Sequence, residues 1–528
     1  MTKANTAKRR LLGSVTAVAT TAIMGTAAFA DEVFLRATDG SFSMRGELMA
    51  SDAGSFTIKT QAGTFDIAAN SVTCSGAGCP EVDTTEQFVS ISGSETVASG
   101  LMPLLLAGYA THNDAAETIE RDILGFTSEI VGDGGFGDHL ANFRVRGTIS
   151  SDAFANLIGR SSQVGLSSRR IRPSEVDLMQ QIGAGDMTSP ANEHIVALDN
   201  LVVITNPENS VQKISMEDLR GIYSGKISNW RQLGGDNAPI TVVSLGAGSA
   251  TKSTFDDRVF GGLAGSVPAN LQSASTSAQV AALVNEDPHA IGYVSHAFQR
   301  GASPMTLVSD CGIEMTADAF SARTEEYALQ RFMYMYTRAD NQGPSPEAFV
   351  DYATSPAADA IVAKSGFIDL GISHREQSFD SQRAQVLLAG YADRGAQRAA
   401  QNMLADMANY DRLSSTFRFE TGSDRLTPRG QVNMERLVEF IGELPAGTKL
   451  KFVGFTDSVG TFQNNRYLAD NRAAQVMATL QREAGAAANG IEMSSVGYSE
   501  IAPVGCNADP AGRASNRRVE VWIESGVL

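Results

Sequence analysis

The feature that most constrains the fold is an alternation of strand and helix patterns over residues 86–371. "FVSISGS" is a strand pattern that runs into a turn, "LVVITNP" is a buried strand stopped by Pro207, and "PITVVSL" and "AIGYVS" are further strands. Helix patterns lie between them, and one of these, "MEDLRGIYSG", follows a capping-box start at Ser215. Strands that alternate with helices predict an α/β domain with a mainly parallel sheet.

Three further regions flank this domain. Residues 31–82 hold short strands with alternating apolar and polar residues, which predicts a small β module. Residues 373–411 are rich in Ala, Arg, Gln and Asp at helical spacing, and we expect a helical connector there. Residues 412–528 again alternate strands with helices, which predicts a second α/β unit.

The first thirty residues have the pattern of a secretory signal peptide. A basic head is followed by a short apolar run that ends in Ala28-Phe29-Ala30, so we expect cleavage before Asp31. The alternative is a membrane anchor, which the short run and its small residues disfavour. No later segment is apolar enough to span a bilayer, so we expect a mature chain in the periplasm with no transmembrane segment.

The charge of the chain limits its partners. There are 42 basic and 59 acidic residues, a net charge of −17. Such a surface repels nucleic acid, so we expect no nucleic-acid partner. An anion could be bound only by local dipoles and one or two buried cations.

Cysteine and histidine spacing adds two expectations. Cys74 and Cys79 flank a Gly-rich turn, and in an oxidising compartment we expect them to form a disulfide. Whether Cys311 and Cys506 pair across domains or stay free is left open. None of the six histidines has a paired-ligand spacing, so we expect neither a metal site nor a cofactor.

Three loops of the central domain are rich in hydroxyl groups: "SGSETV", "GLSSRR" and "GAGSATKS". Helix N-termini bind anions through unpaired N–H groups, and Ser and Thr hydroxyls add donors. Each loop taken singly is more often an ordinary helix cap than a ligand site. The third loop lacks the strict Gly-Lys pair of a nucleotide-binding P-loop, and an exported protein has no nucleotide pool to use.

The stretch "IVALDNLVVITNPENSVQKISMEDLRGIYSGKISNWRQLGGDNAPITVVSLGAGSATKSTF", with "DPHAIGYVS", resembles the PstS-like phosphate-binding periplasmic solute-binding proteins. The resemblance implies a two-lobed type II fold whose second lobe covers about 205–290. It also implies crossing strands near Leu201–Asn206 and Ile291–Val294, and a cleft that closes on a ligand by a hinge. Asp199 would accept a proton from the ligand. The other residues implied to line the anion pocket are Ser94, Thr96, Ser168, Arg169, Ser249, Ala250, Thr251 and Lys252.

Two departures from that family affect the ligand. Leu245 stands where the family has an arginine, and Ala250 stands where it has a glycine. Loss of a charge-assisted fork onto phosphate costs about 1.5–3 kcal/mol. Either Lys252 or Arg169 compensates, or the ligand differs, so we predict a small oxyanion with phosphate as one candidate.

The C-terminal stretches "GFTDSVGTFQNNRYLADNRAAQV" and "GYSEIAPVGCNADPAGRASNRRVEVWI" resemble the OmpA-like peptidoglycan-binding domain. In that family the residues that match Asp457 and Arg472 grip the diaminopimelate of the peptide stem, and Asn465 and Arg517 match further positions of the motif. From spacing alone, a surface ion pair between Asp457 and Arg472 is the simpler explanation.

Together these patterns predict an exported binding protein that holds an oxyanion and is anchored to peptidoglycan, with an ABC transporter or another envelope protein as a further partner. The alternative is a structural wall-anchoring protein whose central domain has lost or changed its ligand. No Ser-His-Asp order or paired-carboxylate motif stands out, so we do not expect an enzyme.

Overall fold

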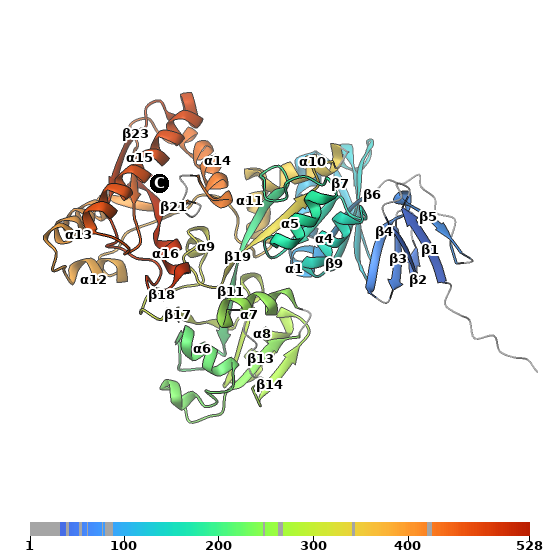
Figure 1. Cartoon of the computed structure of the whole chain (residues 1–528), viewed down its shortest axis with the longest axis horizontal. Coiled ribbons are helices and arrows are strands. Elements are labelled where there is room, and N and C mark those ends of the chain that lie inside the picture. The colour runs from blue at the N-terminus through green and yellow to red at the C-terminus, as the bar shows by residue number, and fades with distance from the viewer. Residues whose placement is uncertain are drawn as a thin grey trace, which may run out of the picture.

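The computed structural model describes residues 32–37, 42–51, 55–60, 62–76, 78–79, 88–246, 249–261, 268–340, 344–419 and 425–528. The predicted signal peptide lies outside these residues. Figure 1 shows the β module at one end of the molecule, two lobes in the middle and the C-terminal unit at the other end. Across the described ranges, every helix is too short or too polar to cross a bilayer.

The β module is one antiparallel sheet of five strands in the order β4-β3-β2-β1-β5. Its core contains Val33, Leu35, Phe56 and Ile58. A disulfide joins Cys74 to Cys79, the pair that we expected to be bridged. The strands are β1 (Glu32–Ala37), β2 (Ser43–Ser51), β3 (Ser55–Thr60), β4 (Gly63–Ala68) and β5 (Val72–Ser75).

The two lobes share one continuous sheet of eleven strands. Its order is β14-β13-β15-β11-β19-β10-β6-β9-β8-β7, and β16 (Ser303–Pro304) also pairs with β11. The α/β class is confirmed, but the sheet is mixed rather than mainly parallel, because hairpin strands and the strands between the lobes run antiparallel to their neighbours.

Lobe one is built on three parallel strands, with β6 between β9 and β10. Both faces of its sheet are covered by helices (Figure 1). Its strands are β6 (Phe88–Ser94), β7 (Ala116–Arg121), β8 (Gly125–Val131), β9 (His139–Thr148) and β10 (Val164–Ser167). Its helices are α1 (Glu95–Gly100), α2 (Met102–His112), α3 (Gly132–Gly135), α4 (Ser150–Ile158), α5 (Pro173–Gln181), α9 (Ala319–Arg323), α10 (Pro344–Thr354) and α11 (Asp359–Lys364).

Lobe two has its own core of aliphatic and aromatic residues, which runs from Leu201 to Leu329. Its strands are β12 (Lys213–Ser215), β13 (Thr241–Leu245), β14 (Leu271–Ala274), β15 (Ala290–Ser295), β17 (Thr306–Val308) and β18 (Glu314–Met315). Its helices are α6 (Met216–Tyr223), α7 (Ala250–Phe260) and α8 (Ser277–Glu286).

Two long strands connect the lobes. β11 (Glu193–Thr205) pairs with β19 (Gln330–Thr337) through its first half and with β15 through its second half. The expected crossing near Leu201–Asn206 agrees with this arrangement. The expected crossing at Ile291–Val294 is wrong, because β15 lies inside lobe two between β11 and β13, and the chain returns to lobe one at β19. Residues 296–329 have only short strands and few sequence signals, which concealed the true return point.

The C-terminal unit is a five-stranded sheet, β20-β21-β24-β22-β23, covered by long helices. Helices α12 and α13 occupy the expected connector, but their side chains pack on this sheet against Phe455 and Trp522, so they belong to the unit. The strands are β20 (His374–Arg375), β21 (Tyr410–Arg418), β22 (Lys449–Gly454), β23 (Glu492–Gly497) and β24 (Arg518–Glu524). The helices are α12 (Gln382–Leu388), α13 (Arg394–Met407), α14 (Pro428–Gly442), α15 (Phe462–Ala484) and α16 (Pro510–Asn516).

Candidate functional site: the interlobe cluster and the C-terminal site

An ion pair lies where the two connecting strands meet. The antiparallel register of β11 and β19 places Asp199 directly opposite Arg331. The Nε of Arg331 is 2.9 Å and its Nη2 is 2.8 Å from Oδ2 of Asp199, and both side chains are buried. Because a buried charge is costly unless it is paired, each of these residues requires the other.

The carboxylate of Asp199 is fully occupied by protein donors. Its Oδ1 accepts hydrogen bonds from Ser295 Oγ at 2.8 Å and from the backbone N–H of His296 at 3.0 Å. With Arg331 on Oδ2, both oxygens are engaged. Asp199 is therefore placed to orient Arg331, whereas we had expected it to accept a proton from the ligand.

The same guanidinium reaches the third hydroxyl-rich loop. Nη2 of Arg331 donates to Thr251 Oγ1 at 3.2 Å, and Thr251 lies buried in the first turn of α7. Asp199 and Thr251, two predicted site residues, are thus brought together through a third residue that sequence reasoning missed. Sequence analysis could have identified Arg331 because it is the one charged residue in the otherwise mostly apolar strand "QRFMYMYT".

The other predicted residues of this loop have different roles. Ser249 caps α7, where its Oγ accepts from the backbone N–H of Lys252 at 3.3 Å. The Nζ of Lys252 pairs with Asp256 at 2.7 Å on the helix surface. Ala250, the first residue of α7, is half-buried, and Leu245 is buried in the core of lobe two. Leu245 therefore brings no charge to this cluster, and the guanidinium that contacts Thr251 is that of Arg331.

Lobe one brings hydroxyl groups to the same edge of the sheet. The strands β6 and β10 are parallel, and β19 runs antiparallel to β10. The C-terminal ends of β6 and β10, at Ser94 and next to Ser168, therefore lie at the same end of the sheet as Arg331 near the start of β19. Gly93 lets β6 and β10 lie close together at this end of the sheet. Its φ is +132°, and a Cβ there would lie 2.1 Å from the carbonyl oxygen of Leu166.

The remaining lobe-one residues are held mainly by local contacts. Ser168 N–H donates to Ser150 Oγ at 3.1 Å, so Ser150 is a further hydroxyl that we had not predicted. Arg169 is engaged by Glu175, with Nη1 and Nη2 at 2.8 Å and 2.7 Å from the carboxylate oxygens. Thr96 is half-buried in the first turn of α1. Arg169 is therefore committed to Glu175 and cannot be the compensating cation in this conformation.

Two buried polar atoms of this cluster have no hydrogen-bond partner within the described part of the chain. They are Nη1 of Arg331 and Oγ of Ser94. Buried polar atoms in proteins are nearly always hydrogen-bonded, so such atoms call for an explanation. Both can donate a hydrogen bond, which fits an acceptor-rich ligand such as an oxyanion.

The C-terminal site brings three predicted residues together. Asp457 lies just beyond β22, and its Oδ2 is 2.8 Å from Nη1 of Arg517. The side-chain amide of Asn465 donates to the carbonyl oxygen of Asp457 at 3.2 Å and to Glu500 at 3.1 Å. The ion-pair partner of Asp457 is thus Arg517, where spacing alone had suggested Arg472.

Arg472, on α15, is half-buried and carries an unsatisfied nitrogen. Its Nη1 is buried without a partner among the described residues, and its guanidinium lies 5.3 Å from the ring of Phe419. Burial lowers the pKa of Arg472, the like charge of Arg517 lowers it further, and Asp457 opposes both effects. A guanidinium with a buried nitrogen that has no partner in the described residues suits a ligand carboxylate.

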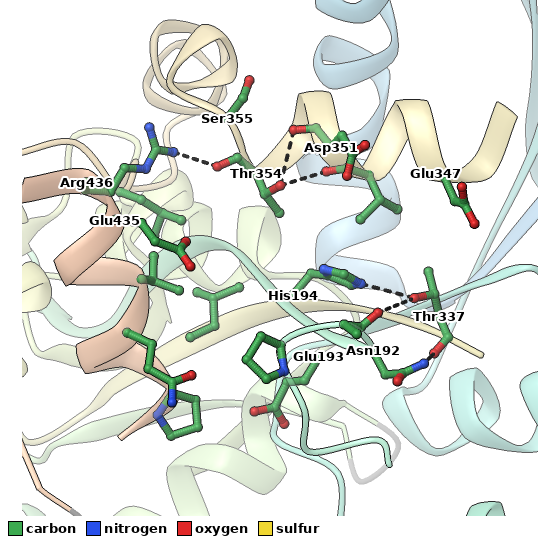
Figure 2. Close-up of a pocket in the computed structure, with 18 of the residues that line it drawn as sticks. Asn192, Glu193, His194, Thr337, Glu347, Asp351, Thr354, Ser355, Glu435 and Arg436 are labelled. Atoms are coloured by element: carbon green, nitrogen blue, oxygen red, sulfur yellow. Dashed lines mark hydrogen bonds between the residues drawn. The ribbon is translucent and has the colours of Figure 1, made fainter. Parts of the chain in front are cut away.

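A cavity of about 660 Å³ lies between lobe one and the C-terminal unit. Figure 2 shows that His194 and Thr337 lie below it, while Thr354 and Arg436 close its upper side. His194 contacts Thr337 Oγ1 at 3.1 Å, and burial lowers the pKa of its imidazole. The cavity therefore marks a joint between two units rather than part of either binding site.

Comparison with known proteins agrees with this architecture. The family described as "PBP superfamily domain" matches residues 59–357, and the OmpA family matches residues 418–517. The chain belongs to the PBP superfamily and carries a C-terminal OmpA domain, as the sequence resemblances predicted.

The similar proteins include phosphate-binding proteins, which match the central domain, and outer membrane proteins, which match the C-terminal domain. The chain is 31% identical over 198 residues to the phosphate-binding protein PstS of Bacillus subtilis (36% of this chain, 64% of that protein). It is 33% identical over 121 residues to outer membrane porin F of Pseudomonas fluorescens (23% of this chain, 36% of that protein). A solved phosphate ABC transporter substrate-binding protein from Clostridium perfringens, with bound phosphate, is 26% identical, with 54% of this chain and 99% of that chain covered and a TM-score of 0.41. The chain thus spans under two thirds of the length of the two curated relatives named here.

Proposed function

We propose that this protein binds a small tetrahedral oxyanion between its lobes and is held to peptidoglycan by its C-terminal domain. The single observation that carries the anion proposal is the pair of buried, unpartnered donors, Nη1 of Arg331 and Oγ of Ser94. An anion bound by both would satisfy two donors that have no partner among the described residues.

Electrostatics supports an anion despite the acidic chain. Arg331 is neutralised by Asp199, so the cluster has no excess charge. The extra attraction comes from dipoles, because α7 points its N-terminus, with Thr251, at Arg331. Hydroxyl donors from Ser94 and Ser168 complete a set that matches oxyanion acceptors.

Phosphate is the first candidate ligand. The relatives from Bacillus subtilis and Borreliella burgdorferi are named as phosphate-binding proteins, and the second is 23% identical over 295 residues, which is 91% of its length. The function that we propose is therefore retention of phosphate or a related oxyanion, with binding rather than catalysis as the role of the cluster around Arg331.

Titration calorimetry with phosphate and sulfate tests the anion site. We expect Arg331→Lys, which keeps a cation beside Asp199 but lacks the Nη1 donor, to weaken phosphate binding at least about tenfold, the equivalent of about 1.4 kcal/mol. Lys252→Gln is the matched control, since this cation is paired on the helix surface, and it should leave binding unchanged. Absence of heat with every oxyanion for the parent chain would contradict the proposal and favour the structural alternative.

The proposed anchor is the cluster of Asp457, Arg472 and Arg517. Asp457 would receive the ammonium group and Arg472 the carboxylate of a diaminopimelate stem. Sedimentation with purified diaminopimelate-type peptidoglycan tests this assignment: Asp457→Ala should leave the protein in the supernatant. Arg482→Ala, an exposed substitution on the same helix as Arg472, is the control and should still sediment.

The curated relatives named above are phosphate-binding proteins and an outer membrane porin, which supports an envelope location. We propose that the signal peptide at residues 1–30 exports the chain and that the mature protein stays next to the wall. An ABC transporter that takes up the anion would therefore have to bind this protein while the protein is attached to the cell wall.

A further inference from the structure

A covalent bond ties lobe two to the C-terminal unit. Cys311, in the loop between β17 and β18, is disulfide-bonded to Cys506, which precedes α16. This resolves the pairing that the sequence left open. Next to this bond, the side chain of Gln382 donates to the carbonyl oxygen of Gly312 at 2.6 Å and accepts from Glu314 N–H at 2.9 Å. The tip of lobe two is therefore fixed to the C-terminal unit.

The C-terminal unit also grips lobe one. Nη2 of Arg436, on α14, donates to the carbonyl oxygen of Thr354 at 2.8 Å, as Figure 2 shows, and its guanidinium pairs with Asp359 of α11 at 3.2 Å. The backbones of Ser373 and Ser414 also join lobe one's exit segment to β21, with Ser414 N–H donating to Ser373 O at 2.7 Å. The C-terminal unit thus contacts both lobes: it is joined to lobe two by a disulfide and to lobe one by hydrogen bonds and an ion pair.

This arrangement opposes hinge motion. Lobe two can turn relative to lobe one only about β11 and β19, and such a turn moves Cys311 relative to α14. The residues of the proposed anion site, Ser94, Ser168, Asp199, Thr251 and Arg331, are each at most 3% exposed. The lobes are therefore closed over the site in the conformation that the disulfide holds, and an anion cannot enter or leave without opening them.

We propose that the Cys311–Cys506 disulfide is a redox-controlled latch that keeps the two lobes closed, so that the oxidised protein retains its anion and the reduced protein exchanges it. The part that concerns the anion rests on the proposed function. The mechanical part rests only on the disulfide, the hinge strands and the contacts of α14.

The latch is accessible to a reductant. Cys311 is exposed and lines a cavity of about 770 Å³ between lobe two and the C-terminal unit, whereas Cys506 is buried. A dithiol reductant would attack Cys311 Sγ as a thiolate, and the electron pair of the broken S–S bond would pass to Cys506 Sγ. The N–H of Cys311 already donates to that sulfur at 3.2 Å and would stabilise the leaving thiolate.

The second step completes the electron balance. The other thiol of the reductant attacks the mixed disulfide, forms the cyclic disulfide of the reductant and releases Cys311 as a thiol. Two electrons and two protons pass from the dithiol to the two cysteines. Lobe two is then held only by non-covalent contacts.

The test compares two cysteine-pair variants of the full chain. Cys311→Ser with Cys506→Ser removes the latch, and Cys74→Ser with Cys79→Ser removes the other disulfide as the matched control. Release of radiolabelled phosphate into excess unlabelled phosphate should be at least tenfold faster for the first variant and unchanged for the second. Release within twofold of the parent rate for both variants would overturn the proposal.

A ligand-free measurement separates this proposal from the proposed function. Amide hydrogen exchange over Thr251–Phe255 and Asp199–Ile204 should be at least tenfold faster in the variant without the latch than in the control. Unchanged exchange would overturn the latch even if no variant binds phosphate. Should the serine variant of the latch fail to fold, dithiothreitol treatment of the Cys74→Ser, Cys79→Ser variant, in which Cys311–Cys506 is the disulfide left to reduce, provides the comparison. The thiols are trapped by alkylation and identified by mass spectrometry.

Discussion

Asp199 and Arg331 lie opposite each other on the two strands that connect the lobes, with the guanidinium bonded to the carboxylate through both Nε and Nη2. Asp199 receives two more hydrogen bonds from Ser295 and His296, and Arg331 extends to Thr251 in lobe two. The hinge and the proposed anion site are therefore built from the same two residues.

Loss of Asp199 should be costly for folding. Asp199→Ala leaves the buried guanidinium of Arg331 without its partner, which typically costs about 3–5 kcal/mol. We expect a clear drop in the melting temperature of the central domain by scanning calorimetry. Phosphate should restore part of this loss, because an anion would supply a substitute charge. A melting temperature equal to that of the parent chain would show that the pair does not stabilise the hinge.

Ser94→Ala should separate binding from stability. The hydroxyl has no partner in the part of the chain that the structure describes, so its removal should leave the melting temperature unchanged or slightly higher. Phosphate affinity should fall by about two- to thirteenfold, the effect of one lost hydrogen bond of about 0.5–1.5 kcal/mol. Ser92→Ala on the same strand is the control: its hydroxyl bonds Ser162 and Asn156, so stability should fall while affinity holds.

Arg472→Met should weaken ligand binding at the C-terminal site with little loss of stability. Its buried Nη1 has no partner in the described residues, so folding should lose little, while the proposed contact with a stem carboxylate is lost. We expect at least about a tenfold loss of peptidoglycan affinity in a sedimentation titration. A variant that sediments like the parent would remove Arg472 from the proposed anchor.

The raised pKa of Asp359 should make the stability of the contact between lobe one and the C-terminal unit depend on pH. Burial raises this pKa to about 6, and Asp369 also raises it, although Arg436 opposes the shift. Because the folded chain holds this proton more tightly than the unfolded chain, the stability that this group contributes is present at low pH and is lost as pH rises through about 4 to 6.

Asp359→Asn removes that ionisation and is the direct test. The melting temperature of the variant relative to the parent should increase between pH 5 and pH 8, because only the parent has to ionise a buried carboxyl group. Titration of the other carboxyl groups affects both chains and cancels in the difference. A difference that stays constant across this range would show that Asp359 ionises normally.

Much of the architecture could be predicted because it is encoded locally. Strand and helix periodicity identified the α/β domains, and hydroxyl-rich turns such as the one at Ser249 marked helix starts. The long C-terminal motif predicted that Asp457 and Arg517 would share one site, and they are 2.8 Å apart. The places of Arg169 and Lys252 in the loops predict two anion-binding cations, but local acidic neighbours engage both.

The sequence by itself determined the class of each fold and the starts of helices such as α7, since these depend on neighbours a few residues apart. Only the tertiary structure decided that Arg331 is the cation of the interlobe cluster and that Cys311 bonds to Cys506. The first contact joins residues 132 positions apart and the second joins residues 195 positions apart. Contacts of this kind depend on strand register and domain docking, which no local pattern of residues reveals.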